Sequence, residues 1–374
     1  MDLRLVQSHE LAEAARLADS IFRDGEQSSM GDAFPDLFTP GIGHSYGAFT
    51  QEGQLVAFMG MAPGVVRIGP ARLRVFSMGA VCTHEAARGQ GIGSRLLALC
   101  KAHAEAAGAS LLFISGDRSL YTRAHCYPFG HTERFTLDAA AAERLQARSA
   151  AEPLLPGELQ PADLPAMHEL AAARCVAYEQ SVTDLPRLLA AEAYAGCFKL
   201  THRTLTARRQ DGSLAAYAIF AVPGTAAGRK NPFAVEWGGS PEGVALLLAA
   251  AVGRFGLQAL DVTAAWHEEA LLRLLGDTGL RPVSGTNGGT LYLVNAQRLL
   301  QQAAPYWGET PLPSVSLMED GQYRLTGDGG AETVLTQGEL VRELFDPGSL
   351  EPEARSALLL PALPLPNVNG LNYI

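Results

Sequence analysis

The most informative stretch, residues 77–108, reads SMGAVCTHEAARGQGIGSRLLALCKAHAEAAG. A long apolar strand is predicted over residues 72–83, and a helix over residues 93–107 that Gly108 ends. Between them, Arg88-Gly89-Gln90-Gly91-Ile92-Gly93 has three glycines in five positions, so backbone N–H groups can approach a ligand closely. The unpaired N–H groups and positive dipole at the helix start complete an anion site suited to a pyrophosphate.

Several interpretations of this loop compete. Chance glycines in a surface loop are the default for a bare G-x-G-x-G. A dinucleotide-binding fold requires G-x-G-x-x-G, which the spacing here does not match, and a P-loop requires a Gly-Lys-Ser/Thr that is absent. The remaining interpretation is Arg-x-x-Gly-x-Gly placed directly after a long strand.

That motif resembles the acyl-coenzyme-A signature of the GCN5-related N-acetyltransferase (GNAT) superfamily. The predicted order of elements over about residues 1–140, ending in a strand over 131–137, is similar to the fold of that superfamily. The resemblance implies that pantetheine pairs with the backbone of Val81 and Thr83. It also implies that the pyrophosphate of acetyl-CoA is held by Arg88, Gly89, Gly91, Gly93 and Ser94.

A second landmark is Tyr121, on a helix predicted over residues 119–125 after a buried strand over 111–115. In the family a tyrosine at this place protonates the departing thiolate, so the resemblance makes Tyr121 the general acid. The alternative is a tyrosine that packs its helix. The family often follows this residue with Gly-Phe, whereas this chain has His125-Cys126-Tyr127-Pro128.

The same order of elements repeats later in the chain and ends in a strand predicted over residues 290–294. This second copy lacks the cofactor-binding motif. At the corresponding loop, Pro241 removes an N–H donor and Glu242 would repel a pyrophosphate. Trp237, Trp266 and Trp307 are interpreted as packing residues. The layout resembles acetyltransferases of the enhanced-intracellular-survival type. It implies an α+β fold with mixed sheets: a catalytic GNAT domain over 1–145, a degenerate GNAT-like domain over 146–299, and a small sterol-carrier-like α+β domain with an apolar tail over 300–374.

No side chain declares itself as the base that takes the proton from an attacking amine. The carboxylates of Glu26, Asp32 and Asp36 are predicted to be solvated loop groups, and His84 and His125 to be surface or packing residues. In the family that this layout resembles, the terminal carboxylate enters the first active site. The apolar end of this chain therefore makes the α-carboxylate of Ile374 a candidate base or substrate anchor; the alternative is a tail packed on its own domain.

Composition limits the partners. Of 374 residues, 47% are hydrophobic, which excludes a disordered chain, and the net charge of −10 disfavours binding to nucleic acid. No apolar run reaches the ~20 residues of a membrane span, and the N-terminal residues lack the basic start and apolar core expected of a signal peptide. Five scattered cysteines indicate buried thiols in a reducing compartment. The sequence thus predicts a cytoplasmic protein, with a homo-oligomer left open.

Three functions remain in competition. The first is an acetyl-CoA-dependent N-acetyltransferase that acts on an amine, for which the net charge suits a cationic acceptor such as a polyamine, an aminoglycoside or a lysine side chain. The second is an acyl-CoA sensor without catalysis, and the third is a scaffold. The intact loop over 88–93 argues against the third, and Tyr121 favours the first over the second.

Overall fold

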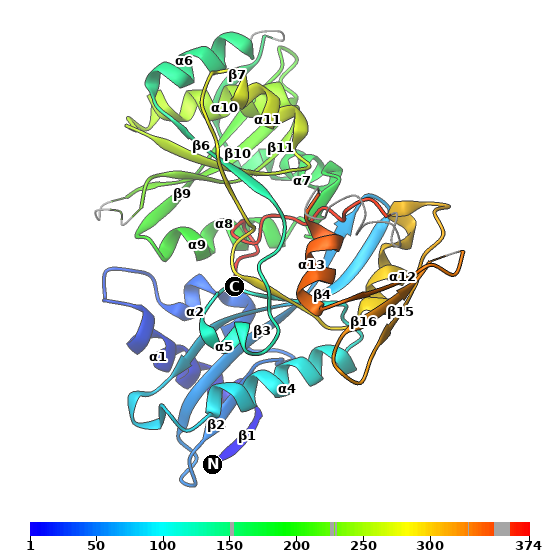
Figure 1. The fold of residues 1–374 in the computed structure, drawn as a ribbon. Helices are drawn as coiled ribbons and strands as arrows, with labels where there is room; N and C mark the ends of the chain where they lie inside the picture. Colours follow the sequence, from blue (N-terminus) through cyan, green and yellow to red (C-terminus); the bar gives the residue numbers. More distant parts are fainter. Residues whose placement is uncertain (150–152, 225–227, 229, 328, 348–359) are drawn as a thin grey trace. The chain divides into compact units, whose positions relative to one another are not determined.

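A computed structural model describes residues 1–149, 153–224, 228, 230–327, 329–347 and 360–374. Their contacts divide the chain into two units, each a mixed α/β structure built around a sheet (Figure 1). Unit 1 comprises Met1–Gly130, Thr286–Val368 and Ile374, and unit 2 comprises His131–Gly285 and Asn369–Tyr373. The boundaries predicted at residues 145 and 299 therefore lie inside unit 2 and unit 1 respectively.

The main sheet of unit 1 has the strand order β1-β2-β3-β4-β5-β14. Its centre is the long hairpin of β3 and β4, whose alternate side chains face opposite sides of the sheet. Strand β4 pairs in parallel with β5 on its other edge. The strands are β1 (Asp2–Leu5), β2 (Tyr46–Phe49), β3 (Leu55–Ile68), β4 (Ala71–Thr83), β5 (Leu111–Ile114) and β14 (Thr290–Leu293).

Helices cover both faces of this sheet. The apolar stripe of α4 (Leu96, Leu97 and Cys100) packs in one buried cluster with Met59 and Met78 of the sheet. On the opposite face, the ring of Phe38 in α3 stacks on that of Phe58 at 5.2 Å. These helices are α1 (Leu11–Phe22), α2 (Met30–Ala33), α3 (Pro35–Phe38), α4 (Ile92–Ala106) and α5 (Ser119–Thr122).

The last strand of each predicted repeat belongs to the other sheet. Strand β6 (Thr132–Leu137) pairs with β12 in unit 2, although the sequence places it in the first domain. Strand β14 pairs with β5 in unit 1, although the sequence places it in the second repeat. Those two assignments are wrong, because local patterning identifies a strand without naming its partner.

The sheet of unit 2 has the order β13-β6-β12-β11-β10-β9-β7 and packs on the apolar helix α10. Trp237 is buried in that core as expected. Besides β6, the strands of this sheet are β7 (Leu155–Glu158), β9 (Leu200–Arg208), β10 (Leu214–Pro223), β11 (Phe233–Gly239), β12 (Leu260–Ala265) and β13 (Val283–Gly285). The short strand β8 (Val176–Tyr178) is not part of it. The helices are α6 (Ala139–Arg148), α7 (Leu164–Ala173), α8 (Asp184–Ala191), α9 (Ala193–Gly196), α10 (Pro241–Arg254) and α11 (Glu269–Gly276).

The segment after residue 295 forms the helices and strands that the sequence predicts, but within unit 1. Gln302 of α12 accepts from the N–H of Arg74 at 3.0 Å and donates to Gly108 O at 3.3 Å, which joins it to the main sheet and to the end of α4. A sterol-carrier-like domain stays a prediction, and residues 328 and 348–359 of that segment lie outside the described residues. The elements are α12 (Ala296–Trp307), β15 (Ser314–Leu317), β16 (Tyr323–Thr326), β17 (Glu332–Leu335) and α13 (Gln337–Phe345).

The cysteines are free thiols, and the expectation that they are buried holds only in part. Cys82, Cys100 and Cys126 are buried, whereas Cys197 is half-buried and Cys175 is exposed. Within the described ranges, no helix has both the length and the apolar character needed to cross a bilayer.

Candidate functional site

The site begins at a bulge in β4. Gly79 lies opposite Gly60 and Cys82 lies opposite Phe58, so two residues of β4 face one of β3. One of the two, Ala80, has φ of 50°, a left-handed conformation that alanine rarely adopts. The bulge changes the direction of the β4 backbone at a point where β4 is still paired with β3.

At the same point β4 loses its other neighbour. The parallel pairing ends at Met78 and Ile114, followed by one bond of 3.0 Å from the Ser115 N–H to Met78 O. No described strand pairs with β4 on this side beyond that bond. The backbone around the predicted residues Val81 and Thr83 therefore presents an edge to which an extended ligand can add like a strand.

The glycine loop follows, and it leaves room for an anion. Gly89 and Gly91 have φ of 77° and 70°, and a Cβ added to either would meet no atom within 4 Å. Gly91 is the N-cap of α4, and no side chain caps the helix. The N–H groups of the first turn, which includes Gly93 and Ser94, thus have no side-chain cap, as a pyrophosphate site requires.

The corresponding loop of unit 2 is closed on itself. The hydroxyl of Ser240 accepts from the Gly243 N–H at 3.2 Å, and Pro241 occupies the first position of α10. A Cβ at Gly239 would overlap the carbonyl oxygen of Ala215. The donors that α4 leaves uncapped are thus capped or missing at α10, which supports the prediction that the second repeat lacks the pyrophosphate site.

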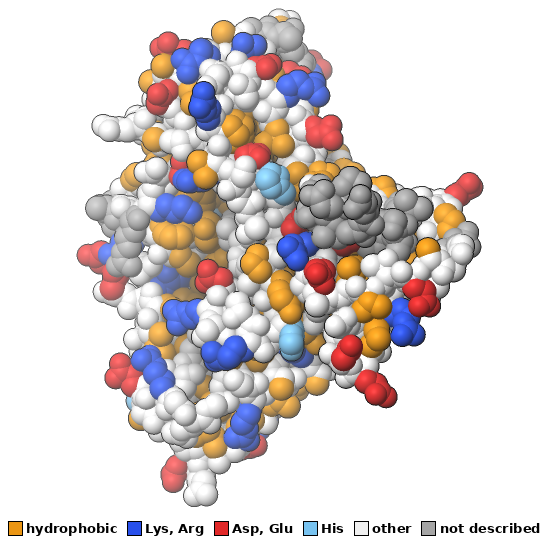
Figure 2. Space-filling view, in the orientation of Figure 1, with side chains coloured by type: hydrophobic (Ala, Val, Ile, Leu, Met, Phe, Trp, Pro, Cys, Tyr) orange, Lys and Arg blue, Asp and Glu red, His pale blue; other side chains and the backbone are white. Residues whose placement is uncertain are grey.

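Basic side chains surround the loop in unit 1 despite the negative net charge. Figure 2 shows Lys and Arg side chains gathered over the part of the molecule that carries α4 and α5. The Arg88 Nε–H donates to the carbonyl oxygen of Thr83 at 3.2 Å, so two of the predicted cofactor residues contact each other. The exposed arginines of these segments are Arg88, Arg95, Arg118 and Arg123.

Tyr121 lies on α5 with its side chain 6% exposed. Its ring fits against Gly116, where a Cβ would come within 2.8 Å of it. Burial raises the pKa of the phenol to about 12, against the opposing effect of the Arg118 guanidinium. The hydroxyl is therefore protonated at neutral pH. The ammonium of Lys101 on α4 donates to Ala124 O and so holds the end of α5 in place.

Ile374 reaches the same region of unit 1. A Cβ on Gly79 would overlap the carbonyl carbon and oxygen of Ile374, and would lie 2.9 Å from Ser115 Oγ. Since Ser115 adjoins Gly116, which contacts Tyr121, the end of β5 connects the two residues that the sequence predicts as catalytic. Ile374 is 7% exposed, so it is buried in this unit.

Three features of this neighbourhood have no clear signal in the sequence. They are the bulge at Ala80, the hydroxyl of Ser115, and the support of β5 by Thr290. The Thr290 hydroxyl donates to Gly116 O at 2.8 Å from a strand 174 positions later in the chain. The pair Ser115-Gly116 directly after a buried strand is the one local hint, since glycine there allows close approach.

The other acidic and histidine candidates lie as predicted, exposed to solvent. Asp32 accepts from the hydroxyl of Ser29 at 2.8 Å and belongs to a helix cap. His84 accepts from the Ala86 N–H at 3.3 Å in a similar role. The exposed residues are Glu26, Asp32, Asp36, His84 and His125.

Comparisons with known proteins agree with this geometry. Residues 2–129 match the family described as Acetyltransferase (GNAT) domain. No curated protein matches the chain by sequence.

Solved structures with this fold include three that cover most of the chain. A GCN5-related N-acetyltransferase from Anabaena variabilis has a TM-score of 0.65 at 13% identity, covering 97% of this chain and 99% of its own. Eis1 from Mycobacterium abscessus has a TM-score of 0.65 at 12% identity, covering 98% and 99%. A probable N-acyltransferase from Enterococcus faecalis has a TM-score of 0.66 at 15% identity, covering 90% and 85%.

Proposed function

We propose that this protein, whose residues 2–129 match the family described as Acetyltransferase (GNAT) domain, is an acyltransferase that moves an acetyl group from acetyl-CoA to an amine. The observation that carries the proposal is the gathering of Tyr121 and Ile374 around Ser115-Gly116, beside the unpaired edge of β4. An edge, an anion site and a buried proton donor are the parts that direct acyl transfer needs.

The groups that would hold acetyl-CoA fit its chemistry. The pantetheine amides would pair with the backbone of Val81 and Thr83, and the pyrophosphate would be bound by N–H groups of the loop and first turn of α4. Arg88 adds positive charge beside that loop. Acetyl-CoA supplies an acyl group activated as a thioester. The pyrophosphate-binding residues are Arg88, Gly89, Gly91, Gly93 and Ser94.

Tyr121 would supply the proton for the leaving group. As the amine nitrogen forms its bond to the acyl carbon, the bond from that carbon to sulfur breaks and sulfur takes the phenolic proton. Burial raises the pKa of Tyr121 to about 12, so the hydroxyl carries its proton at neutral pH, as a proton donor must. Tyr121 regains a proton from solvent after the products leave.

The α-carboxylate of Ile374 would accept the proton that the attacking amine loses, directly or through one water. Its place beside Gly79 supports this, since Gly79 precedes the bulge at which the free edge of β4 starts. Backbone N–H groups near Val81 would polarise the acyl carbonyl. The acceptor is an amine, and the net charge of −10 favours a cationic one through steering.

Thermal unfolding with and without acetyl-CoA tests the cofactor and the loop together. A ligand that binds only the folded state, present at 100 times its dissociation constant, raises the free energy of unfolding by about 2.7 kcal/mol. We expect wild type to be stabilised and Gly91→Glu to lose the effect, because a carboxylate then occupies the anion site. Gly212→Glu is the matched control, since Gly212 has φ of 86° with nothing within 4 Å of an added Cβ.

Release of free thiol from acetyl-CoA, measured against a panel of polyamines, aminoglycosides and lysine peptides, tests turnover. Stabilisation without turnover on any amine would favour an acyl-CoA sensor. No stabilisation of wild type would contradict the proposed function altogether.

A further inference from the structure

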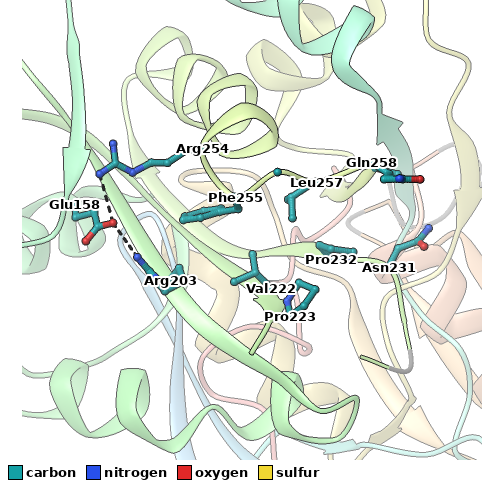
Figure 3. A pocket seen from close by; sticks show the side chains of 12 residues that line it. Glu158, Arg203, Val222, Pro223, Asn231, Pro232, Arg254, Phe255, Leu257 and Gln258 are labelled. Atoms are coloured by element: carbon teal, nitrogen blue, oxygen red, sulfur yellow. Dashed lines mark hydrogen bonds and ion pairs between the residues drawn. The ribbon is translucent and has the colours of Figure 1, made fainter. Parts of the chain in front are cut away.

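A pocket of about 870 Å³ lies in unit 2, at the end of α10 opposite to its N-terminal loop. Its apolar lining includes Val222, Pro232 and Leu257, and Figure 3 shows the ring of Phe255 beside them. A volume of this size suits a small organic molecule. Nothing in the proposed acetyl transfer uses this pocket.

One wall of the pocket carries a cluster of unbalanced charge. The Oε1 atom of Glu158 accepts from Arg203 at 2.8 Å and from Arg254 at 3.3 Å (Figure 3). Two guanidinium groups thus share a single carboxylate oxygen, which leaves the cluster with a charge of +1 and with further N–H donors. The three side chains are 42–49% exposed, so an anion in the pocket can reach them.

The aromatic ring lies between this charge and the apolar lining. The guanidinium carbon of Arg203 lies 5.5 Å from the centroid of the Phe255 ring, within the range of a cation–π contact. Val222 and Leu257 are at most 9% exposed and form the apolar floor of the pocket. The pocket therefore offers an apolar surface beside a pair of arginines.

The C-terminal end of α10 disfavours an anion through the helix dipole, and two features there reduce that effect. The carbonyl oxygen of Ala251 accepts from the Phe255 N–H at 3.0 Å, and that of Val252 accepts from the Leu257 N–H at 2.9 Å. These acceptors at the negative end of the helix are thus already satisfied. Arg254, in the last turn, adds positive charge where the helix dipole favours it.

We propose that this pocket binds a small aromatic carboxylate, with its ring beside Phe255 over Val222 and Leu257 and its carboxylate on Arg203 and Arg254. Arginine suits this role because its planar fork donates two parallel hydrogen bonds to a carboxylate. Glu158 competes with the ligand for the N–H donors of the two guanidinium groups. The site is independent of the proposed acetyl transfer in unit 1.

Fluorine NMR of 4-(trifluoromethyl)benzoate with the full-length protein tests the proposal. We expect saturable binding that persists with excess coenzyme A, and weaker binding by about tenfold in Arg254→Gln. Glu158→Gln should instead bind the probe several-fold more tightly, because it removes the competing negative charge. Arg148→Gln is the matched control: Arg148 is 51% exposed and also pairs with one carboxylate of unit 2, that of Asp277.

The cation 4-(trifluoromethyl)benzylamine has a similar shape and opposite charge, and should bind far more weakly. Equal binding of the two probes would overturn the proposal, as would weaker binding of the benzoate by Glu158→Gln. Displacement of the benzoate by coenzyme A would also overturn it, because the probe would then occupy the acyl-CoA site. The gain in Glu158→Gln remains decisive even if Arg254→Gln does not fold.

Discussion

The carbonyl group of Ile374 lies against Gly79, on the side of the backbone where any other residue would carry its Cβ. Both residues belong to unit 1, although they lie far apart in the sequence. Gly79 is thus a position where a close approach, rather than a turn, requires glycine. A side chain at residue 79 and a terminal group beside β4 exclude each other.

Gly79→Ala should separate these two groups. The added methyl overlaps Ile374 and crowds Ser115, so we expect the terminal group to be displaced and kcat/KM to fall by about 100-fold, with acetyl-CoA binding retained. Gly41→Ala is the control, since its added Cβ meets nothing within 4 Å. Unchanged kcat/KM in Gly79→Ala would contradict a catalytic role for the terminal group.

Extension of the chain by one glycine after Ile374 should remove the terminal carboxylate from its place while leaving the isoleucine. Loss of a general base lowers kcat by about 10²- to 10⁴-fold. Ile374→Val keeps the carboxylate and should stay within about threefold of wild type. We would measure thiol release under saturating acetyl-CoA, and an extended protein with full kcat would exclude Ile374 as the base.

Tyr121→Phe removes the proposed proton donor but keeps the buried ring. We expect kcat to fall by about 10²- to 10⁴-fold at pH 7, while stabilisation by acetyl-CoA stays as in wild type. Tyr127→Phe is the matched control, because its hydroxyl contacts the exposed His125 ring at 3.3 Å and lies outside the proposed machinery. Equal losses in the two variants would indicate a general effect of removing a hydroxyl.

Thr290→Val tests the support that β14 gives to β5. Thr290 is 1% exposed, and valine would leave the carbonyl oxygen of Gly116 without the hydrogen bond of 2.8 Å. We expect a loss of about 1–2 kcal/mol in the free energy of unfolding, measured with urea, together with lower turnover. Thr326→Val, which removes an exposed contact with Glu332, should change neither by much.

Glu10→Gln should change how stability depends on pH. Two hydrogen bonds from Arg4, of 2.8 and 2.7 Å, lower the pKa of the Glu10 carboxyl from 4.5 to about 2. Because the folded pKa is the lower one, the pair stabilises the fold above pH 4.5, and this contribution is lost as the pH falls through 2. At pH 7 the variant should be less stable by about 1 kcal/mol, a value reduced for the solvent around Arg4.

Urea unfolding of both proteins at a series of pH values measures this effect. The difference in unfolding free energy should shrink as the pH falls from about 5 towards 2. A difference that stays constant across that range would mean that glutamine disrupts packing rather than an ion pair.

Features that depend on neighbours along the chain are readable in the sequence. The glycine loop, the uncapped start of α4 and the place of Tyr121 after a buried strand follow from residues a few positions apart, because turns and helix ends are local structures. The helices and strands after residue 295 were predictable for the same reason. The contrast between the loops before α4 and α10 also follows from which residues carry an N–H or a negative charge.

Features that depend on partners distant in the chain emerge only when it is folded. The alternating polar and apolar residues of β6 and β14 predict two strands, but they do not specify the strand with which each one pairs. In the structure β6 pairs with β12 in the sheet of unit 2, and β14 pairs with β5 in the sheet of unit 1. The bulge at Ala80 is set by its register with β3, and the meeting of Ile374 with Gly79 by the path of the whole chain. Local sequence thus determines which motifs and candidate site residues the chain has, while long-range packing determines which of these residues contact one another.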